Sequence, residues 1–307
     1  MDFERQFTAG MTTSFIKARV LLFGVLRRTA KVFERMSNHF EPRSGTSLGA
    51  PGTLTGSGEN PLQEKSSADD ADPGSLQRAF EHPLLNLAAE FIHLYGVEGD
   101  YLEFGVFEGR SFASAYAALK KRQQLFQGPR RRFWAFDSFQ GLPEPSGVDA
   151  LRGKFLVWDR FFSGRGVQPT QEFLSKGQFA CSRESFVANL RASGVDLADV
   201  EIVEGYFHES LTPELKRRHE LTRAAIIHVD VDYYSSTVQV LEFVSDLIQD
   251  GTIIIFDDFF CYRGHPDKGE RRAFTEFLAA HPEILATDWH HWGVSAAAFI
   301  LNRRDAI

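Results

Sequence analysis

Residues 101–111 have the sequence YLEFGVFEGRS, which predicts a strand, a turn and a helix in succession. The apolar run Tyr101–Val106 is typical of a buried strand. The helical periodicity of Arg110–Lys121 follows it, after a turn that contains Gly105 and Gly109. Glycine in such a turn lets the backbone adopt a positive φ and approach a ligand closely. A strand, a glycine-containing turn and a helix in this order indicate an α/β fold with a ligand site at the turn.

The charge of this turn favours a ligand with a cationic end. Its spacing is G-x-x-x-G rather than the G-x-G-x-x-G of dinucleotide sites, and Glu103 and Glu108 place negative charge where a phosphate would lie. A sulfonium that carries an α-amino group is a ligand of the required charge. The alternative is that the two glycines serve only the packing of the helix on the strand.

Short apolar runs alternate with amphipathic stretches as far as the C-terminus, which predicts a mainly parallel sheet covered by helices. The further strands are expected at Phe133–Phe136, Val200–Val203, Ala224–Val229, Thr252–Phe256 and Ser295–Leu301. The further helices are expected at Ser185–Ala192, Thr237–Ile248 and Glu270–Ala280. Residues 138–181 fit neither period. They are expected to form a long excursion that closes over the site as a lid, with Trp158, Phe161 and Phe162 as its aromatic side chains.

Asp137 follows the second expected strand, within the stretch FDSFQGLP at residues 136–143. An acidic residue at the end of the strand after a glycine-containing turn can accept hydrogen bonds from both hydroxyls of a ribose. We therefore expect Asp137 to bind the ribose of the ligand. The alternative is that its side chain caps a turn or a helix.

Four carboxylates follow the fourth and fifth expected strands. Asp230 and Asp232 come after the fourth strand, and Asp257 and Asp258 come after the fifth. Carboxylates crowded at one edge of a sheet raise each other's pKa, and a bound cation relieves this repulsion. Oxygen ligands without clustered cysteine or histidine favour Mg²⁺ over zinc. Capping of the following helix would explain one of these pairs but not both, so the sequence predicts a Mg²⁺ site.

Charge is distributed unevenly along the 307 residues, whose net charge is −7. Residues 1–37 contain seven Lys and Arg against three Asp and Glu, which gives them +4 and leaves −11 for the rest. An acidic body of this kind binds nucleic acid poorly, so we expect no DNA or RNA partner.

The chain is expected to have three parts. Residues 1–37 include a basic amphipathic helix at 12–36, which could dock on this chain, on a second subunit of a homo-oligomer, or on a membrane surface. Residues 38–75 are rich in Gly, Ser, Pro and acidic side chains and are expected to be a flexible linker. Residues 76–307 would then form the folded domain that carries the site.

The location expected for the protein is the cytoplasm, with residues 12–36 as a candidate contact to the inner membrane surface. No run approaches the ~20 apolar residues that span a bilayer, and no cleavage site follows the apolar residues 20–26, which argues against a signal peptide. Cys181 and Cys261 are too few for a disulfide framework.

Three histidines are weaker candidates. His208 lies after the third expected strand and could contact a ligand or act as a base. His290 and His291 are adjacent, and neighbours on a strand point to opposite faces, so we expect structural or surface roles for them rather than a shared metal.

Five motifs in order carry a resemblance to a known family. They are EFGVFEGRS at 103–111, FDSFQGLP at 136–143, GYF at 205–207, DVDYYSST at 230–237 and DD at 257–258. With them, residues 80–303 resemble the macrocin O-methyltransferases, which use S-adenosylmethionine and a metal to methylate sugar hydroxyls of natural products. The resemblance implies the class I methyltransferase fold, a Rossmann-like doubly wound sheet of seven strands with one antiparallel strand near the C-terminus.

The resemblance also implies the role of each site residue. The cofactor would be held by Glu103, Gly105, Gly109 and Ser111 at its methionine end, by Asp137 at its ribose, and by Gly205 and Tyr206 at its adenine. Mg²⁺ would be held by Asp230, Asp257 and Asp258, with Asp230 also the catalytic base. Asp232 would lie behind them, although an exchange of roles with Asp230 stays open. The family usually has an acidic residue where this chain has Ser235, a departure that bears on the acceptor.

Two other functions are compatible with parts of the pattern. Asp-x-Asp after an apolar strand, with a later Asp-Asp pair, also occurs in Mg²⁺-dependent phosphohydrolases of the haloacid dehalogenase type. Against them, Asp230 stands late in the domain and the turn at Gly105 would have no purpose. A non-catalytic scaffold that uses its basic helix to recruit partners is the second alternative. The acceptor itself, whether a macrolide sugar, another glycan or a small phenol, is left open by the sequence.

Overall fold

The computed structural model describes residues 82–126, 128–149 and 174–304, which belong to one compact unit of the chain. The predictions for residues 1–37, for the linker 38–75 and for Trp158, Phe161 and Phe162 lie outside the described residues. Within the described part, no helix has the length and apolarity that crossing a membrane requires.

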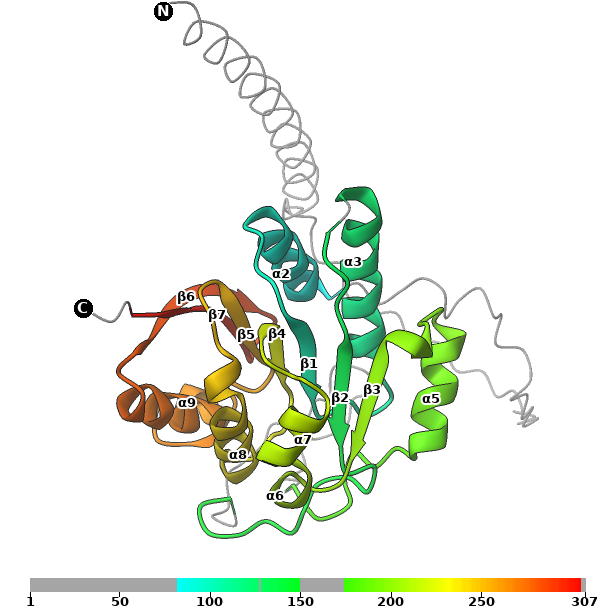
Figure 1. Ribbon diagram of the computed structural model, residues 1–307. Coiled ribbons are helices and arrows are strands. Elements are labelled where there is room, and N and C mark those ends of the chain that lie inside the picture. The colour runs from blue at the N-terminus through cyan, green and yellow to red at the C-terminus, as the bar shows by residue number, and fades with distance from the viewer. Residues whose placement is uncertain (1–81, 127, 150–173, 305–307) are drawn as a thin grey trace, which may run out of the picture. The chain divides into compact units, whose positions relative to one another are not determined.

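The described residues form a seven-stranded sheet in the order β3-β2-β1-β4-β5-β7-β6 (Figure 1). Its strands are β1 (Asp100–Phe104), β2 (Phe133–Asp137), β3 (Val200–Glu204), β4 (Ala224–Val229), β5 (Thr252–Phe256), β6 (Ile284–Trp292) and β7 (Ala296–Arg303). The five strands from β3 to β5 run parallel, and β7 is antiparallel to both of its neighbours. This arrangement confirms the predicted fold class, including the single antiparallel strand.

All six strands expected from apolar runs are present, whereas β6 was not predicted from its residues. Most of its side chains are exposed, so it lacks the apolar run that marks the predicted strands.

The helices differ from the predictions mainly at their ends. They are α2 (Pro83–Leu94), α3 (Arg110–Phe126), α5 (Arg183–Ala192), α6 (Phe207–Ser210), α7 (Pro213–Arg218), α8 (Tyr234–Val244) and α9 (Gly269–Ala280). The prediction for α8 was wrong at both ends. The helix begins at Tyr234 rather than Thr237, and its last turn tightens into a 3-10 helix at Ser245–Leu247 before Ile248. The helices α2, α6 and α7 were not predicted.

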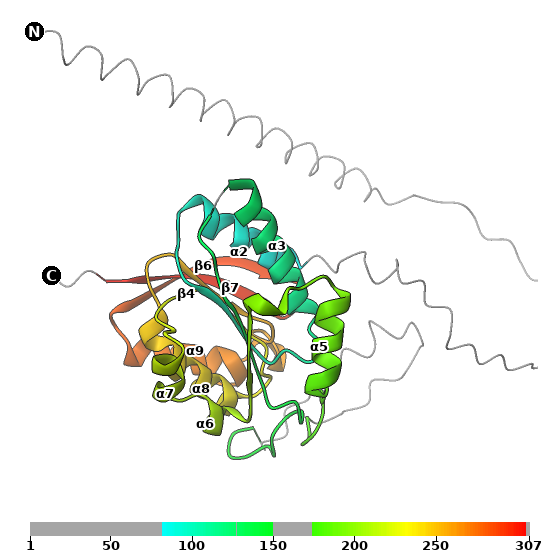
Figure 2. The same cartoon turned by 45° about the vertical axis from the view of Figure 1, so that its right-hand side comes forward.

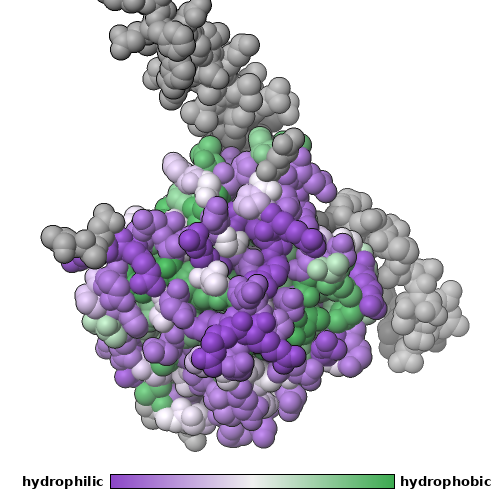
Figure 3. Space-filling model, viewed as in Figure 1, coloured by the Kyte–Doolittle hydropathy of each residue, from purple (hydrophilic) through white to green (hydrophobic). Residues whose placement is uncertain are grey.

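Two hydrophobic cores cover the two faces of the sheet. Alternate residues of each buried strand point to opposite faces, so Tyr101 packs with α2, α3 and α5, whereas Leu102 and Phe104 pack with α8 and α9. Figure 2 shows α2, α3 and α5 on one side of the sheet and α8 and α9 on the other. The largest buried side chains lie in these cores, and the face in Figure 3 is mostly hydrophilic with smaller apolar areas.

Candidate functional site

The acidic residues predicted to meet at the carboxyl ends of the strands do meet there. The last residues of β1, β4 and β5 are paired in register, and Gly105, Asp230 and Asp257 follow them directly. The Asp230 amide donates to the Phe104 carbonyl at 2.9 Å, and the Asp257 amide donates to the Val229 carbonyl at 3.0 Å. Backbone pairing therefore continues one residue beyond the strands and fixes where both carboxylates leave the sheet. We call Asp230, Asp232, Asp257 and Asp258 the acidic rim.

The carboxylates of the acidic rim destabilise one another's charge. Burial raises the pKa of Asp230 well above its ordinary value, and Asp257 and Asp258 raise it further. Burial and the neighbouring Asp230 raise the pKa of Asp232 to about 7. The pKa of Asp258 is also raised, by burial and then by Asp232 and Asp257. This edge of the sheet therefore favours a bound proton or a bound cation.

In their present conformations these side chains do not form a complete metal site. No group of three or more His, Cys, Asp or Glu side chains within the described ranges is arranged to hold an ion. Asp258 is engaged elsewhere, because the Cys261 thiol donates to its Oδ1 at 2.9 Å. Its own amide donates to Glu270 Oε2 at 2.9 Å. Metal binding by three of these carboxylates would require side chains to turn.

The two glycines of the first turn are explained by close packing within the protein. A Cβ on Gly105, whose φ is +78°, would lie 1.9 Å from the Asp230 carbonyl oxygen. A Cβ on Gly109 would lie 2.8 Å from the Phe186 ring and 3.1 Å from Leu190, both on α5. Packing is thus sufficient to account for both glycines, and their contact with a cofactor stays a prediction.

Glu103 lies beneath the turn and is fully buried. Its carboxylate accepts hydrogen bonds from the Tyr101 hydroxyl and, at 2.5 Å, from the Ser111 hydroxyl at the start of α3. The His228 ring, buried on β4, lies 3.6 Å from the same carboxylate through Nδ1. Glu103 therefore ties the start of α3 to the sheet, and Ser111 is the part of this network nearest the solvent.

Asp137 holds the same turn from the end of β2. Its Oδ2 accepts the backbone amides of Val106, at 2.8 Å, and Phe107, at 3.2 Å, and its Oδ1 accepts the amide of Phe139 at 2.7 Å. The carboxylate thus has the turn-capping role that was the alternative prediction. A carboxylate oxygen can accept more than one hydrogen bond, so ribose binding remains open to it.

Gly205 and Tyr206 lie beside Asp137. The Gly205 amide donates to the Asp137 carbonyl at 2.9 Å, which brings the end of β3 next to the end of β2. The Tyr206 ring stacks on His208, with centroids 6.0 Å apart. The His208 side chain is mostly exposed and lies 3.5 Å from Glu209. The structure therefore places the residues predicted for the adenine end next to the residue predicted for the ribose.

Asp149 belongs to this region, although the sequence analysis did not identify it. Its carboxylate accepts the amides of Tyr234, at 2.9 Å, and Ser235, at 3.1 Å, and so caps α8 directly after the acidic rim. The helix's own N-cap residue, Tyr233, makes no side-chain cap. Asp149 lies in a loop 85 residues before Tyr234, so the local sequence gives no indication that its carboxylate caps α8.

An Asp149→Ala variant is expected to lose about 1 kcal/mol of the free energy of unfolding, because two amides at the start of α8 lose their acceptor. Urea unfolding of the purified chain measures this loss. Asp149→Asn keeps an acceptor oxygen and is the matched control, expected to lose less. Equal stability of the alanine variant and the wild type would contradict the capping role.

His290 and His291 lie on the edge strand β6, and both side chains are exposed. His291 pairs with Asp288 at 3.1 Å, and its ring lies 5.0 Å from the Phe260 ring. The His290 ring lies 4.6 Å from the Trp289 ring. The surface position expected for these two histidines is confirmed.

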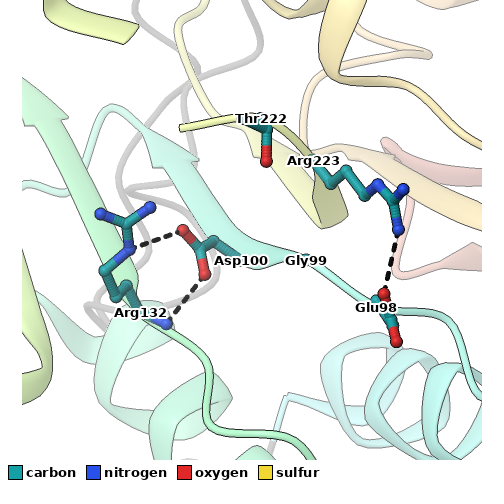
Figure 4. Close-up of a pocket in the computed structure, with 6 residues that line it drawn as sticks. All are labelled: Glu98, Gly99, Asp100, Arg132, Thr222 and Arg223. Atoms are coloured by element: carbon teal, nitrogen blue, oxygen red, sulfur yellow. Dashed lines mark hydrogen bonds and ion pairs between the residues drawn. The ribbon is translucent and has the colours of Figure 1, made fainter. Parts of the chain in front are cut away.

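A pocket lies at the amino ends of the strands, whereas the predicted site lies at their carboxyl ends. Figure 4 shows its lining, which is Glu98, Gly99, Asp100, Arg132, Thr222 and Arg223. These residues precede or begin β1, β2 and β4, so the pocket lies at the amino ends of the strands. Arg132 already binds Asp100 at 3.0 Å, and Arg223 binds Glu98 at 2.9 Å. The arginines are thus satisfied within the protein.

Comparison with known proteins gives a family match over the region just described. Residues 82–286 match the model of the macrocin O-methyltransferase family. A relative from Streptomyces olivaceus, 8-demethyl-8-(2,3-dimethoxy-alpha-L-rhamnosyl)-tetracenomycin-C 4'-O-methyltransferase, is 27% identical over 201 residues, which cover 62% of this chain and 68% of that protein.

Two solved structures share the fold. The O-methyltransferase NovP aligns with a TM-score of 0.51 at 20% identity, over 72% of this chain and 78% of NovP. The calicheamicin methyltransferase CalS11 aligns with a TM-score of 0.53 at 21% identity, over 76% of this chain and 87% of CalS11.

Proposed function

Since the chain belongs to the macrocin O-methyltransferase family and is an O-methyltransferase, we propose that it transfers the methyl group of S-adenosylmethionine to a sugar hydroxyl, with Mg²⁺ at the acidic rim. The observation that carries this proposal is the convergence of Asp230 and Asp257 beside the turn at Gly105. The match of residues 82–286 to this family favours methyl transfer over the phosphohydrolase alternative.

The cofactor would lie across the carboxyl ends of β1, β2 and β3. Ser111 and the turn between β1 and α3 would receive the methionine end, Asp137 the ribose, and Gly205 with Tyr206 the adenine. Ligands in open α/β sheets bind at this edge. The acidic surroundings favour the sulfonium and amino group of S-adenosylmethionine over a phosphate-bearing cofactor.

The acceptor class proposed is a sugar, free or attached to a natural product. The relative from Streptomyces olivaceus is named as acting on a rhamnosyl group of a tetracenomycin. The similarity to this chain covers about two thirds of each protein, so the proposal extends to the type of acceptor rather than to that compound.

Mg²⁺ fits the charge and the donor atoms of the acidic rim. Its side chains supply only carboxylate oxygens, which hard divalent cations prefer, and burial together with mutual repulsion raises the pKa values of Asp230, Asp232 and Asp258. Asp230, Asp257 and Asp258 would hold the ion after turning of their side chains. When bound, the ion would orient the acceptor and lower the pKa of its hydroxyl.

Methyl transfer itself is an in-line displacement, and the protein aligns the reactants for it. The acceptor oxygen forms a bond to the methyl carbon as the carbon–sulfur bond breaks, and that electron pair goes to sulfur. The hydroxyl proton would pass to the Asp230 carboxylate, which leaves the sheet at the end of β4 beside the turn at Gly105. The products are the methyl ether and S-adenosylhomocysteine.

Calorimetric titration with S-adenosylhomocysteine, combined with turnover of a rhamnosylated acceptor, tests this proposal. We expect the chain to bind S-adenosylhomocysteine, and we expect turnover to disappear with a chelator and return with Mg²⁺. A chain that does not bind S-adenosylhomocysteine would contradict the cofactor. Turnover that is unchanged by the chelator would contradict the role of the metal while leaving methyl transfer intact.

A further inference from the structure

Glu270 is a fifth carboxylate at the acidic rim, and its side chain is fully buried. It is the second residue of α9, and the preceding Gly269, with φ +56°, lets that helix start close to the Tyr262 ring. A Cβ on Gly269 would lie 2.7 Å from this ring. The start of α9 thus packs closely against the segment that follows β5 and carries Asp257 and Asp258.

The two carboxylate oxygens of Glu270 differ in their hydrogen bonding. Oε2 accepts the backbone amide of Asp258 at 2.9 Å. Oε1 is buried and has no hydrogen-bond partner among the described residues. Asp258, Asp230 and Asp257 are the charged groups that act on this carboxylate most strongly, in that order, so it lies among the residues of the rim.

A buried carboxylate with a free oxygen is costly unless a positive group reaches it. A glutamate in the first turn of a helix commonly accepts amides of its own helix, yet Glu270 binds the amide of Asp258 instead. Within the part of the chain that the structure describes, the charged groups that act most strongly on Glu270 and Asp258 are carboxylates, and no Lys or Arg is among them. The free oxygen is therefore suited to a cation supplied from solution.

We propose that Glu270 is an additional residue of the divalent-cation site, which holds Asp258 in place through its amide and faces the bound ion with its free oxygen. This inference rests on the proposed function, because it assigns a further residue to the same metal site. It adds a residue that comes 12 positions after Asp258 and outside the five sequence motifs.

Glu270→Gln tests the inference with a minimal change. Glutamine keeps the size of the side chain and an oxygen for the Asp258 amide, but it cannot offer a carboxylate to a cation. Glu276→Gln is the matched control, since Glu276 lies on the same helix but is exposed and binds Arg272 at 2.9 Å. The measurements are calorimetric titration with Mg²⁺ and with Mn²⁺, and the melting temperature with and without each ion.

For Glu270→Gln we expect at least about a tenfold loss of metal affinity, of the size seen when residues that support metal ligands are replaced. Without metal the melting temperature should not fall below that of the wild type, because glutamine keeps the acceptor for the Asp258 amide, and the increase caused by metal should shrink. Glu276→Gln should behave as the wild type. A role in folding alone would instead lower the metal-free melting temperature and leave metal affinity unchanged, which would overturn the inference.

The same measurements separate this inference from the proposed function. If the wild type binds metal and Glu270→Gln binds it equally well, only the inference is wrong. If the wild type binds neither ion, the metal part of the proposed function is wrong as well. Titration of both proteins with S-adenosylhomocysteine then shows whether the cofactor part stands. If Glu270→Gln does not fold, Glu270→Asp, which keeps the charge but shortens the side chain, should fold and bind metal more weakly than the wild type.

Discussion

An Asp230→Asn variant is expected to bind S-adenosylhomocysteine as the wild type does and to lose methyl transfer by about a thousandfold, the range of a lost general base. Asparagine has the shape of aspartate but can neither accept the proton of the acceptor hydroxyl nor offer a charged oxygen to a cation. The Asp230 backbone amide still donates to the Phe104 carbonyl, so the end of β4 should keep its position. The rate of S-adenosylhomocysteine formation at saturating cofactor measures the effect.

Two further variants make this result specific. Asp288→Asn is the same substitution at an exposed residue of β6 that pairs with His291, and its rate should equal that of the wild type. Asp232→Asn should lower the rate less than Asp230→Asn does. The opposite order would assign the base to Asp232 and reverse the roles of these two residues, whereas a nearly normal rate for Asp230→Asn would contradict both the base and the metal ligand at that position.

The sequence predicted the strands in which apolar residues recur. Ala224–Val229 is fully buried under both cores, so a continuous apolar run marks it. Val200–Glu204 lies at one edge of the sheet and is only partly buried, but Val200, Ile202 and Val203 still mark it. The edge strand Ile284–Trp292 has no such run. Its side chains are mostly exposed to solvent, and its backbone pairs with β7. Neither feature produces an apolar pattern in the sequence.

The position of the site was predictable because it follows from topology. Parallel strands bring their carboxyl ends to one edge, so residues that follow β1, β4 and β5 had to meet there. The partners within the site were not predictable in the same way. The hydrogen bonds of Glu103 with Tyr101 and Ser111 were not predicted, and its contact with the cofactor stays a prediction. The contacts of Asp149 and Glu270 depend on how loops return to the sheet, which residue spacing does not determine.

A Gly105→Ala variant is expected to lose at least about 3 kcal/mol of the free energy of unfolding, and methyl transfer with it. The added Cβ would lie 1.9 Å from the Asp230 carbonyl oxygen, which is backbone and cannot turn away. Either β1 or β4 must move, and both carry residues of the site. Urea unfolding gives the stability, and titration with S-adenosylhomocysteine shows whether the turn can still bind the cofactor.

Gly194→Ala separates this steric effect from backbone strain. Gly194 has the same φ as Gly105, +78°, but no atom lies within 4 Å of the position of its missing Cβ. Its substitution should therefore lower the free energy of unfolding only by the cost of placing an L-residue in the left-handed conformation, about 1–2 kcal/mol. The excess cost at Gly105 measures the close approach of β1 and β4. Equal losses for the two variants would mean that the strands adjust freely, and the close packing of the first turn would then not explain why glycine stands there.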